Sequence, residues 1–129
     1  MTAVGDVTCA FAPDVFDPNC PSRSVLEHLT SKWGVLVLGA LQRGTRRFGE
    51  LRREVGGVSE KMLAQTLQTL ERDGLVHREV RPVIPPHVDY SLTPRGRQAA
   101  KLVRALYVWV ERNIDDVLQA QEAHDLSKS

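Results

Sequence analysis

Residues 49–92 read GELRREVGGVSEKMLAQTLQTLERDGLVHREVRPVIPPHVDYSL, and this stretch decides the fold. Its first part, residues 49–55, has apolar residues at helical spacing, and Gly56-Gly57 then forces a turn. Ser59 is a typical N-cap for a second helix, which Gly74 ends. The stretch therefore begins with two helices joined by a short turn.

A small hairpin follows these helices. Residues 75–81 and 87–92 alternate in polarity as strands do, and the proline-rich segment 82–86 between them predicts a stiff tip. Thr93-Pro94 is a cap followed by proline at the first helical position, and one long helix is expected from there to about residue 125.

Two more helices precede the deciding stretch. A short helix starts at Pro21, and an apolar one over residues 32–42 is expected to be buried, with an extended connector over residues 45–48. This order of elements predicts a mainly α protein with a small β-hairpin wing. Such a fold is a winged helix-turn-helix, here with dimerisation helices at both ends.

The chain has 129 residues, 42% of them hydrophobic and 26% charged, which suits one ordinary domain with a buried core. Residues 1–19 lack periodicity and predict a flexible arm before a domain over residues 20–125. The longest apolar run, residues 34–41, is too short to cross a membrane. No cationic targeting segment precedes Arg23, so we expect a cytoplasmic protein with reduced cysteines.

The helix after Ser59 carries the features of a DNA-reading helix. Its core side holds leucines, while the opposite side is a polar stripe without a carboxylate. Gln pairs well with adenine, and Lys and Arg suit guanine or phosphate. The candidate DNA-binding residues of this helix are Ser59, Lys61, Gln65, Gln68 and Arg72. The alternative is a solvated face of an amphipathic helix.

Two further groups of cationic residues are candidates for DNA contact. Arginines around the start of the helix at residues 49–55 suit phosphate: Arg46, Arg47, Arg52 and Arg53. Residues Arg78, Arg81 and His87 flank the tip of the predicted hairpin, where phosphate or a minor groove is within reach. The alternative for the hairpin is a set of charges that keep it soluble.

The long last helix carries an apolar stripe that one small domain cannot cover, which predicts a symmetric homodimer. Its dimerisation candidates are Leu102, Val103, Leu106, Trp109, Val110, Ile114 and Val117; those of the first helix are Val25, Leu26 and Leu29. The first turns of the last helix are also expected to pack within the chain. A dimer presents two reading helices to half-sites of a palindromic operator in double-stranded DNA.

Several blocks occur in series over residues 20–115: Cys20-Pro21, Lys32-Trp33, Arg47-Phe48-x-Glu50-Leu51-Arg52, Ser59-Glu60-Lys61-Met62-Leu63 and Pro85-Pro86-His87-Val88-x-Tyr90-Ser91-Leu92-Thr93. In order and spacing these blocks resemble the HxlR-type family of bacterial transcriptional regulators. The resemblance implies a dimeric winged-helix DNA-binding protein, usually a repressor, that dimerises through its first and last helices. The arm before Cys20 is longer than is usual in that family.

Some members of that family sense oxidants or electrophiles through the cysteine that matches Cys20. This residue precedes a helix N-terminus and lies near Arg23, and both features stabilise a thiolate. Oxidation would join Cys20 across the dimer or to Cys9, and would shift the first helix. The alternative is a small thiol that fills a gap.

A small molecule is the second expected form of control. Trp33, Tyr107 and Trp109 can line a pocket between the first two helices and the last, or they can belong to the core. No cofactor is implied by any motif.

Other classes of protein find less support in the sequence. The histidines His28, His77, His87 and His124 lie on unlike elements, so neither a catalytic centre nor a metal site is expected, and no phosphate-binding loop is present. A winged helix used only for contact with proteins would favour acidic residues on the polar stripe of the helix after Ser59, and that stripe has none.

Overall fold

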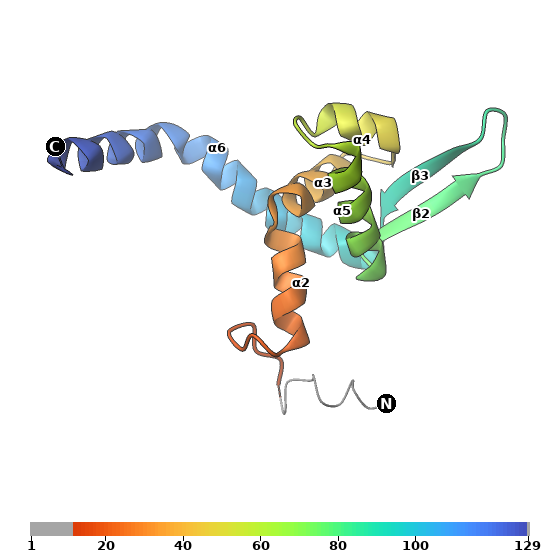
Figure 1. The fold of residues 1–129 in the computed structure, drawn as a ribbon, viewed down its shortest axis with the longest axis horizontal. Coiled ribbons are helices and arrows are strands. Elements are labelled where there is room, and N and C mark those ends of the chain that lie inside the picture. Colours follow the sequence, from red (N-terminus) through yellow and green to blue (C-terminus); the bar gives the residue numbers. More distant parts are fainter. Residues whose placement is uncertain (1–11, 129) are drawn as a thin grey trace.

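The structure, a computed structural model, describes residues 12–128. Its elements are α2 (Pro21–Thr30), α3 (Lys32–Gln42), β1 (Arg46–Arg47), α4 (Phe48–Glu54), α5 (Glu60–Arg72), β2 (Val76–Arg81), β3 (His87–Leu92) and α6 (Pro94–Lys128). Figure 1 shows a mainly helical body from which the β2–β3 hairpin projects as a wing. The predicted fold class is confirmed, and α4 begins one residue earlier than expected.

Helix α3 lies at the centre of the fold, and both α5 and α6 pack against it. Ser31 starts this helix, because its Oγ accepts a hydrogen bond from the Gly34 amide at 3.1 Å. The same hydroxyl donates to the His28 carbonyl at 3.0 Å and so ties the end of α2 to the start of α3. One side chain thus fixes the corner between the two helices.

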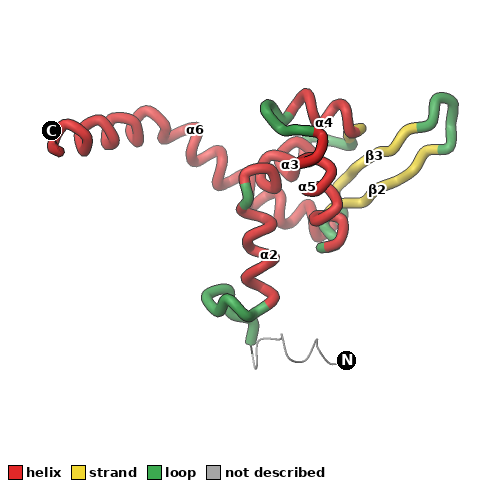
Figure 2. Tube along the Cα trace, viewed as in Figure 1, coloured by secondary structure: helices red, strands yellow, loops and turns green. Residues whose placement is uncertain are grey.

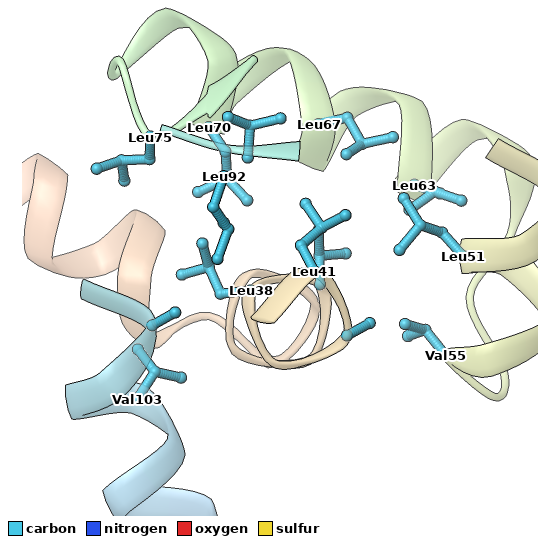
Figure 3. Packing of buried hydrophobic residues seen from close by; sticks show 14 of the residues in the cluster. Leu38, Leu41, Leu51, Val55, Leu63, Leu67, Leu70, Leu75, Leu92 and Val103 are labelled. Carbon is cyan, nitrogen blue, oxygen red and sulfur yellow. The ribbon is translucent and has the colours of Figure 1, made fainter. Parts of the chain in front are cut away.

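The core joins α3 to the two helices of the predicted helix-turn-helix. Leu38 and Leu41 of α3 face Leu63 and Leu67 of α5, and Leu51 of α4 completes this side (Figure 3). Each of the five is at most 3% exposed. Because these α5 leucines, with Leu70, recur at helical spacing, the opposite side of α5 must face solvent.

The sheet is antiparallel, with the strand order β1-β3-β2. Strand β3 pairs with β2 over its whole length, from Val76 opposite Leu92 to Arg81 opposite His87. The short β1 pairs with the other edge of β3 and so anchors the root of the wing. Figure 2 shows both long strands leading away from the helical body to the loop of residues 82–86.

Helix α6 starts against the body and then leaves it. The Thr93 hydroxyl accepts from the Gly96 amide at 3.0 Å and caps the helix, while Ala100 is buried in the core. The helix continues to Lys128, three residues past the expected end, because no glycine or proline stops it. It is about 50 Å long at 1.5 Å per residue. Among the described residues no helix is both long and apolar enough to cross a bilayer.

The segment before α2 is described from Ala12 onward. Here Asp14 and Asp17 accept hydrogen bonds from the amides of Phe16 and Asn19 at 3.0 and 2.9 Å, which folds residues 14–19 into two tight turns. Residues 1–11, with Cys9, lie outside the described residues. The boundary between arm and domain at residue 20 stays a prediction.

Candidate nucleic-acid interface

Helix α5 presents the polar stripe predicted for it. Ser59 holds the start of the helix, because its Oγ accepts from the Met62 amide at 3.1 Å. On the side away from the core, the exposed residues include Lys61, Gln65, Gln68 and Arg72. Two amides and two cations therefore form a surface that matches the donors and acceptors of base edges and phosphates.

The arginines near α4 differ in what they contact. Arg46 Nε lies 2.9 Å from Glu54 Oε1, and Arg43 Nη1 lies 2.9 Å from Glu54 Oε2, so one carboxylate holds two guanidinium groups. Arg46 is half-buried by this arrangement. The Arg46 side chain therefore ties β1 to the end of α4 and is not open to solvent. The sequence did not predict this ion pair because Arg46 and Glu54 are eight residues apart.

The charge of Glu54 follows from these contacts. Burial raises the pKa of its carboxyl, but hydrogen bonds and charge attraction from Arg46 and then Arg43 outweigh burial and hold the pKa below its ordinary value. Glu54 is therefore ionised at neutral pH and keeps both arginines in place.

The other arginines of this region lie closer to α5. Arg52 Nη1 is 3.4 Å from Glu60 Oε1, an ion pair between α4 and the first turn of α5. Arg47 and Arg53 are exposed. The backbone amide of Arg47 donates to Glu50 Oε1 at 2.7 Å, which fixes the start of α4. Arg47, Arg52 and Arg53 thus surround the first helix of the helix-turn-helix with accessible positive charge.

The root of the wing adjoins α5. Gln68 and Glu71 of α5 line a surface hollow together with Arg78 of β2 and Tyr90 of β3. Arg78 and Tyr90 are direct partners across the two strands. The structure therefore brings together two candidates that are ten residues apart in sequence, Gln68 and Arg78, in one corner between helix and wing.

Further along the wing, two of the candidate DNA-binding residues form ion pairs with carboxylates. Arg81 Nε lies 3.0 Å from Asp89 Oδ2, and its Nη1 lies 3.4 Å from Glu79 Oε2. His87 Nε2 lies 3.4 Å from Asp89 Oδ1. Arg81 and His87 were predicted to reach DNA. Any such contact has to compete with Asp89.

A contact that the sequence analysis missed ties α2 to the end of α5. His28 Nδ1 lies 2.6 Å from Asp73 Oδ2, and the Asp73 side chain is 9% exposed. Asp73 is the C-cap residue of α5. Because 45 residues separate the two, no local pattern could have found the pair.

Cys20 is the N-cap residue of α2 and is buried. Its Sγ lies 3.0 Å from the Ser22 hydroxyl and accepts from the Asp14 amide at 3.4 Å. Cys20 is disulfide-bonded in the structure, whereas the sequence predicted a reduced thiol. A thiol pair is reduced or oxidised according to the potential around it, so the structure describes the oxidised state of Cys20.

Arg23, which was expected to lie near Cys20, contacts the segment before α2. Its Nε lies 3.4 Å from Glu27 Oε2, one helical turn along α2, and its Nη1 is within 3.5 Å of the Val15 and Phe16 carbonyls. The guanidinium therefore fastens the preceding loop to α2.

The dimerisation candidates divide into exposed and buried residues. Those exposed on the described chain are Val25, Leu26, Leu102, Leu106, Trp109, Val110 and Ile114. Val117 is half-buried, and Leu29 packs against the core. Val103 is 7% exposed and belongs to the core of its own chain, because α6 packs on α3 at this turn. It is therefore removed from the predicted interface.

The aromatic residues proposed for a pocket lie apart. Trp33 packs on the core, with the Lys32 ammonium 4.3 Å from its ring centre, and Trp109 is exposed on α6. Tyr107 instead closes over Gly39 and lines a hollow between α3, α4 and α6. The structure thus places Tyr107 beside a hollow, whereas Trp33 and Trp109 lie in different surroundings.

Helices α4 and α5, packed beside a small sheet with a projecting wing, define a winged helix-turn-helix, a class of fold that binds DNA. The model of the HxlR-like helix-turn-helix family matches residues 28–117. The chain therefore belongs to this family, and it is a transcriptional regulator with a helix-turn-helix DNA-binding fold.

Relatives and solved structures agree with this assignment. The chain is 57% identical over 109 residues to the HTH-type transcriptional regulator YtfH of Escherichia coli (strain K12), covering 84% of this chain and 86% of that protein. The structure of the transcriptional regulator ytfH from Salmonella typhimurium superposes with a TM-score of 0.82 at 57% identity, over 86% of this chain and 99% of that one.

Two redox-related structures are also similar. The redox regulator HypR in its oxidised form gives a TM-score of 0.67 at 38% identity, over 73% of this chain and 97% of that chain. The crystal structure of diamide-treated YodB from B. subtilis gives a TM-score of 0.62 at 32% identity, over 72% of this chain and 93% of that chain.

Proposed function

We propose that this regulator is a repressor that binds a palindromic operator as a homodimer through α5. The observation that carries the proposal is the exposed stripe of Lys61, Gln65, Gln68 and Arg72, opposite the buried leucines of α5 and beside the wing. A reading helix contacts bases with its N-terminal part, which assigns base contacts to Lys61 and Gln65 and leaves Ser59 as the cap. Gln68 and Arg72 lie nearer the phosphate backbone.

Phosphate contacts position the protein on the duplex without reading its sequence. Arg47, Arg52 and Arg53 around α4 and Arg78 at the root of the wing serve this role. Arg46 supports it indirectly, since Glu54 holds its side chain in place. Arg81 and His87 contribute positive potential to the wing while they pair with Asp89.

The homodimer forms through α2 and α6. Leu102 is 76% exposed and Trp109 is 56% exposed, on a helix that reaches well beyond the body of its own chain (Figure 1). Apolar side chains repeated along such a helix are stabilised by a second copy that buries them. The interface uses the exposed candidates given above and not Val103.

Oxidation at Cys20 controls DNA binding. Cys20 forms a disulfide with a second thiol, either Cys9 of the same chain or Cys20 of a partner subunit, and the oxidant takes up the two electrons and two protons. Cys20 directly precedes α2, and α2 contacts the end of α5 through His28, so a shift of α2 is transmitted to α5. HypR and YodB, a redox regulator and a protein studied after diamide treatment, support this proposal by analogy.

The first test is a gel shift with the DNA that flanks the gene of this protein, at one fixed salt concentration. Wild-type protein should bind, and Lys61→Ala and Gln65→Ala should each weaken binding by roughly tenfold, as the loss of a base contact does. Gln119→Ala, on the exposed far part of α6, is the control and should bind as the wild type does. Wild-type affinity in both α5 variants would contradict the assigned role of this helix.

The redox proposal is tested in the same assay with diamide and then dithiothreitol. Diamide should release the wild-type protein from DNA, and dithiothreitol should restore binding. Cys20→Ser should stay bound in diamide, and persistent release from that variant would contradict control by Cys20. Non-reducing gels of Cys9→Ser separate the two disulfides, because a covalent dimer survives in this variant only if Cys20 pairs across subunits.

The hollow beside Tyr107 supports a second candidate for control, a small apolar ligand. Leu36, Ala40 and Val55 line it together with the charged residues Arg43, Glu54 and Glu111. Because Arg43 also holds Glu54 of α4, a ligand there would act directly on the helix-turn-helix. Operator binding that is indifferent to diamide but changes on titration with an uncharged aromatic compound such as indole would favour this form of control.

A further inference from the structure

The tip of the wing is apolar and fully open to solvent. Residues 82–86 read PVIPP and contain no charged or hydrogen-bonding side chain. Ile84 is 99% exposed and Val83 is 51% exposed. Hairpin tips usually carry polar residues and glycine, which tolerate water and tight turns. Ile84 is the most exposed large apolar side chain of residues 12–128, and together with Val83 it forms an apolar tip that marks a candidate contact surface.

The strands behind the tip hold it rigidly. The ladder of β2 and β3 extends to Arg81 opposite His87, directly before and after the loop. Three of the five loop residues are prolines, whose rings fix their backbone φ angles. The tip thus loses little conformational entropy when it makes a contact.

The charges next to the tip permit approach to an anionic partner. Glu79 and Asp89 are the two carboxylates of the wing strands, and both form ion pairs with Arg81. Asp89 also lies 3.4 Å from His87. Repulsion between these carboxylates and phosphate groups is therefore reduced by cations on the wing itself.

The wing has the length to reach a neighbouring groove of DNA. Its root adjoins α5, since Gln68 and Arg78 line one hollow. A strand of six residues such as β2 spans about 20 Å. Major and minor grooves follow each other at half a helical turn, about 17 Å along the axis. The hairpin projects from the helical body (Figure 1), so with α5 in a major groove its length is enough to bring the tip to the adjacent minor groove.

We propose that Ile84, supported by Val83, is an apolar wedge that packs into the minor groove flanking each half-site and opens a base step there. This rests on the proposed docking of α5 in the major groove. Apolar wedges of this kind partly unstack a step and bend the duplex. The wing then favours flanks with easily deformed pyrimidine–purine steps and adds sequence preference without hydrogen bonds to bases.

The test compares Ile84→Ser with Ile84→Leu on a duplex that carries the operator and a fluorescent dye at each end. Ile84→Ser should lower operator affinity roughly tenfold, of the order of one lost specific contact. It should also abolish the change in energy transfer that reports bending. The salt dependence of binding should stay that of the wild type, because an apolar contact releases no counterions. Ile84→Leu should keep both affinity and bend.

Val80→Ser is the matched control, because Val80 is also exposed but lies back on β2. It should bind and bend DNA as the wild type does. Wild-type affinity and bending in Ile84→Ser would overturn the wedge while leaving the proposed function in place. A change only in self-association of Ile84→Ser would also overturn it and would assign the tip to contact with protein. Failure of the wild-type protein itself to bind the operator would instead remove the proposed function.

Discussion

Gly96 shows how one missing side chain sets the position of a helix. A Cβ at this residue would overlap the backbone carbonyl oxygen of Leu75, so α6 approaches the start of the wing as closely as it does only with glycine here. Gly96→Ala should lower the free energy of unfolding by about 2 kcal/mol, the usual cost of overpacking. Thermal melting should show a loss of several degrees.

Gly56→Ala is the control for this measurement. Nothing lies within 4 Å of a Cβ built at Gly56, and its backbone does not require glycine. Its melting temperature should stay within a degree or two of the wild-type value or rise slightly, because alanine restricts the unfolded chain. Equal losses in both variants would contradict the close approach at Gly96.

The carboxylate of Glu54 gives a prediction about pH. Its pKa in the folded protein lies below the ordinary value because Arg46 and Arg43 hold the charged form against the cost of burial. Ionised Glu54 therefore stabilises the folded state at neutral pH, and this contribution is lost as pH falls through the lowered pKa. Denaturant unfolding at pH 7 should show Glu54→Gln destabilised by about 1 kcal/mol.

The unfolding of the wild type and of Glu54→Gln should also be compared at acid pH. As the pH falls through the lowered pKa of Glu54, the wild type and Glu54→Gln should approach the same stability. A difference that stays constant with pH would mean that the glutamine disturbs packing rather than charge.

At the scale of elements, the exposed arginines of α4 should differ from the reading residues of α5 in their salt dependence. Arg53→Ala removes one of the proposed phosphate contacts, so it should weaken binding to operator and to unrelated DNA alike. The slope of log affinity against log salt should become less steep by about 0.9. Lys61→Ala, in contrast, should reduce the preference for operator over unrelated DNA. Loss of operator preference in Arg53→Ala would contradict this division of roles.

The elements themselves were largely predictable from sequence because their signals are local. Ser59 and Thr93 cap helices, Gly74 ends one with a positive φ, and the strands alternate up to a proline-rich loop. The polar stripe of α5 follows from the helical period alone. The end of α6 was missed because nothing in the sequence marks it, and the helix runs on to Lys128.

The parts of the site that escaped prediction depend on contacts between distant residues. His28 and Asp73 meet only because α2 and the end of α5 are both packed around α3. Two ion pairs, Glu54 with Arg46 and Asp89 with Arg81, likewise depend on how strands and helices are placed in the fold. Composition does not show these positions. The sequence located the two groups of cationic residues, around α4 and on the wing, but not which of them form ion pairs within the fold.

At the scale of the whole molecule, DNA binding should depend on the interface. Leu106→Glu places a charge on the exposed stripe of α6 without touching the core, so the monomer should remain folded. Sedimentation should show a monomer, and affinity for the two-site operator should fall by at least a hundredfold, since linked sites gain that much from joint binding.

Gln119→Glu, an equal charge on another side of α6, controls for the added negative charge. It should remain a dimer and bind the operator. A Leu106→Glu variant that stays dimeric would show that α6 is not the main interface. A monomer that keeps full operator affinity would contradict the requirement for two linked reading helices.

The far part of α6 extends away from the body of its own chain (Figure 1). Substitutions there scarcely affect the packing of the monomer, so this segment is free to diverge between paralogues. In a cell that holds several proteins of one family, heterodimers would combine two unlike copies of α5 and would disturb the regulation of both sets of target genes. In the proposed dimer, exposed residues such as Leu118 and Leu126 give each chain a place to encode recognition of self, separate from both the core and the proposed DNA surface.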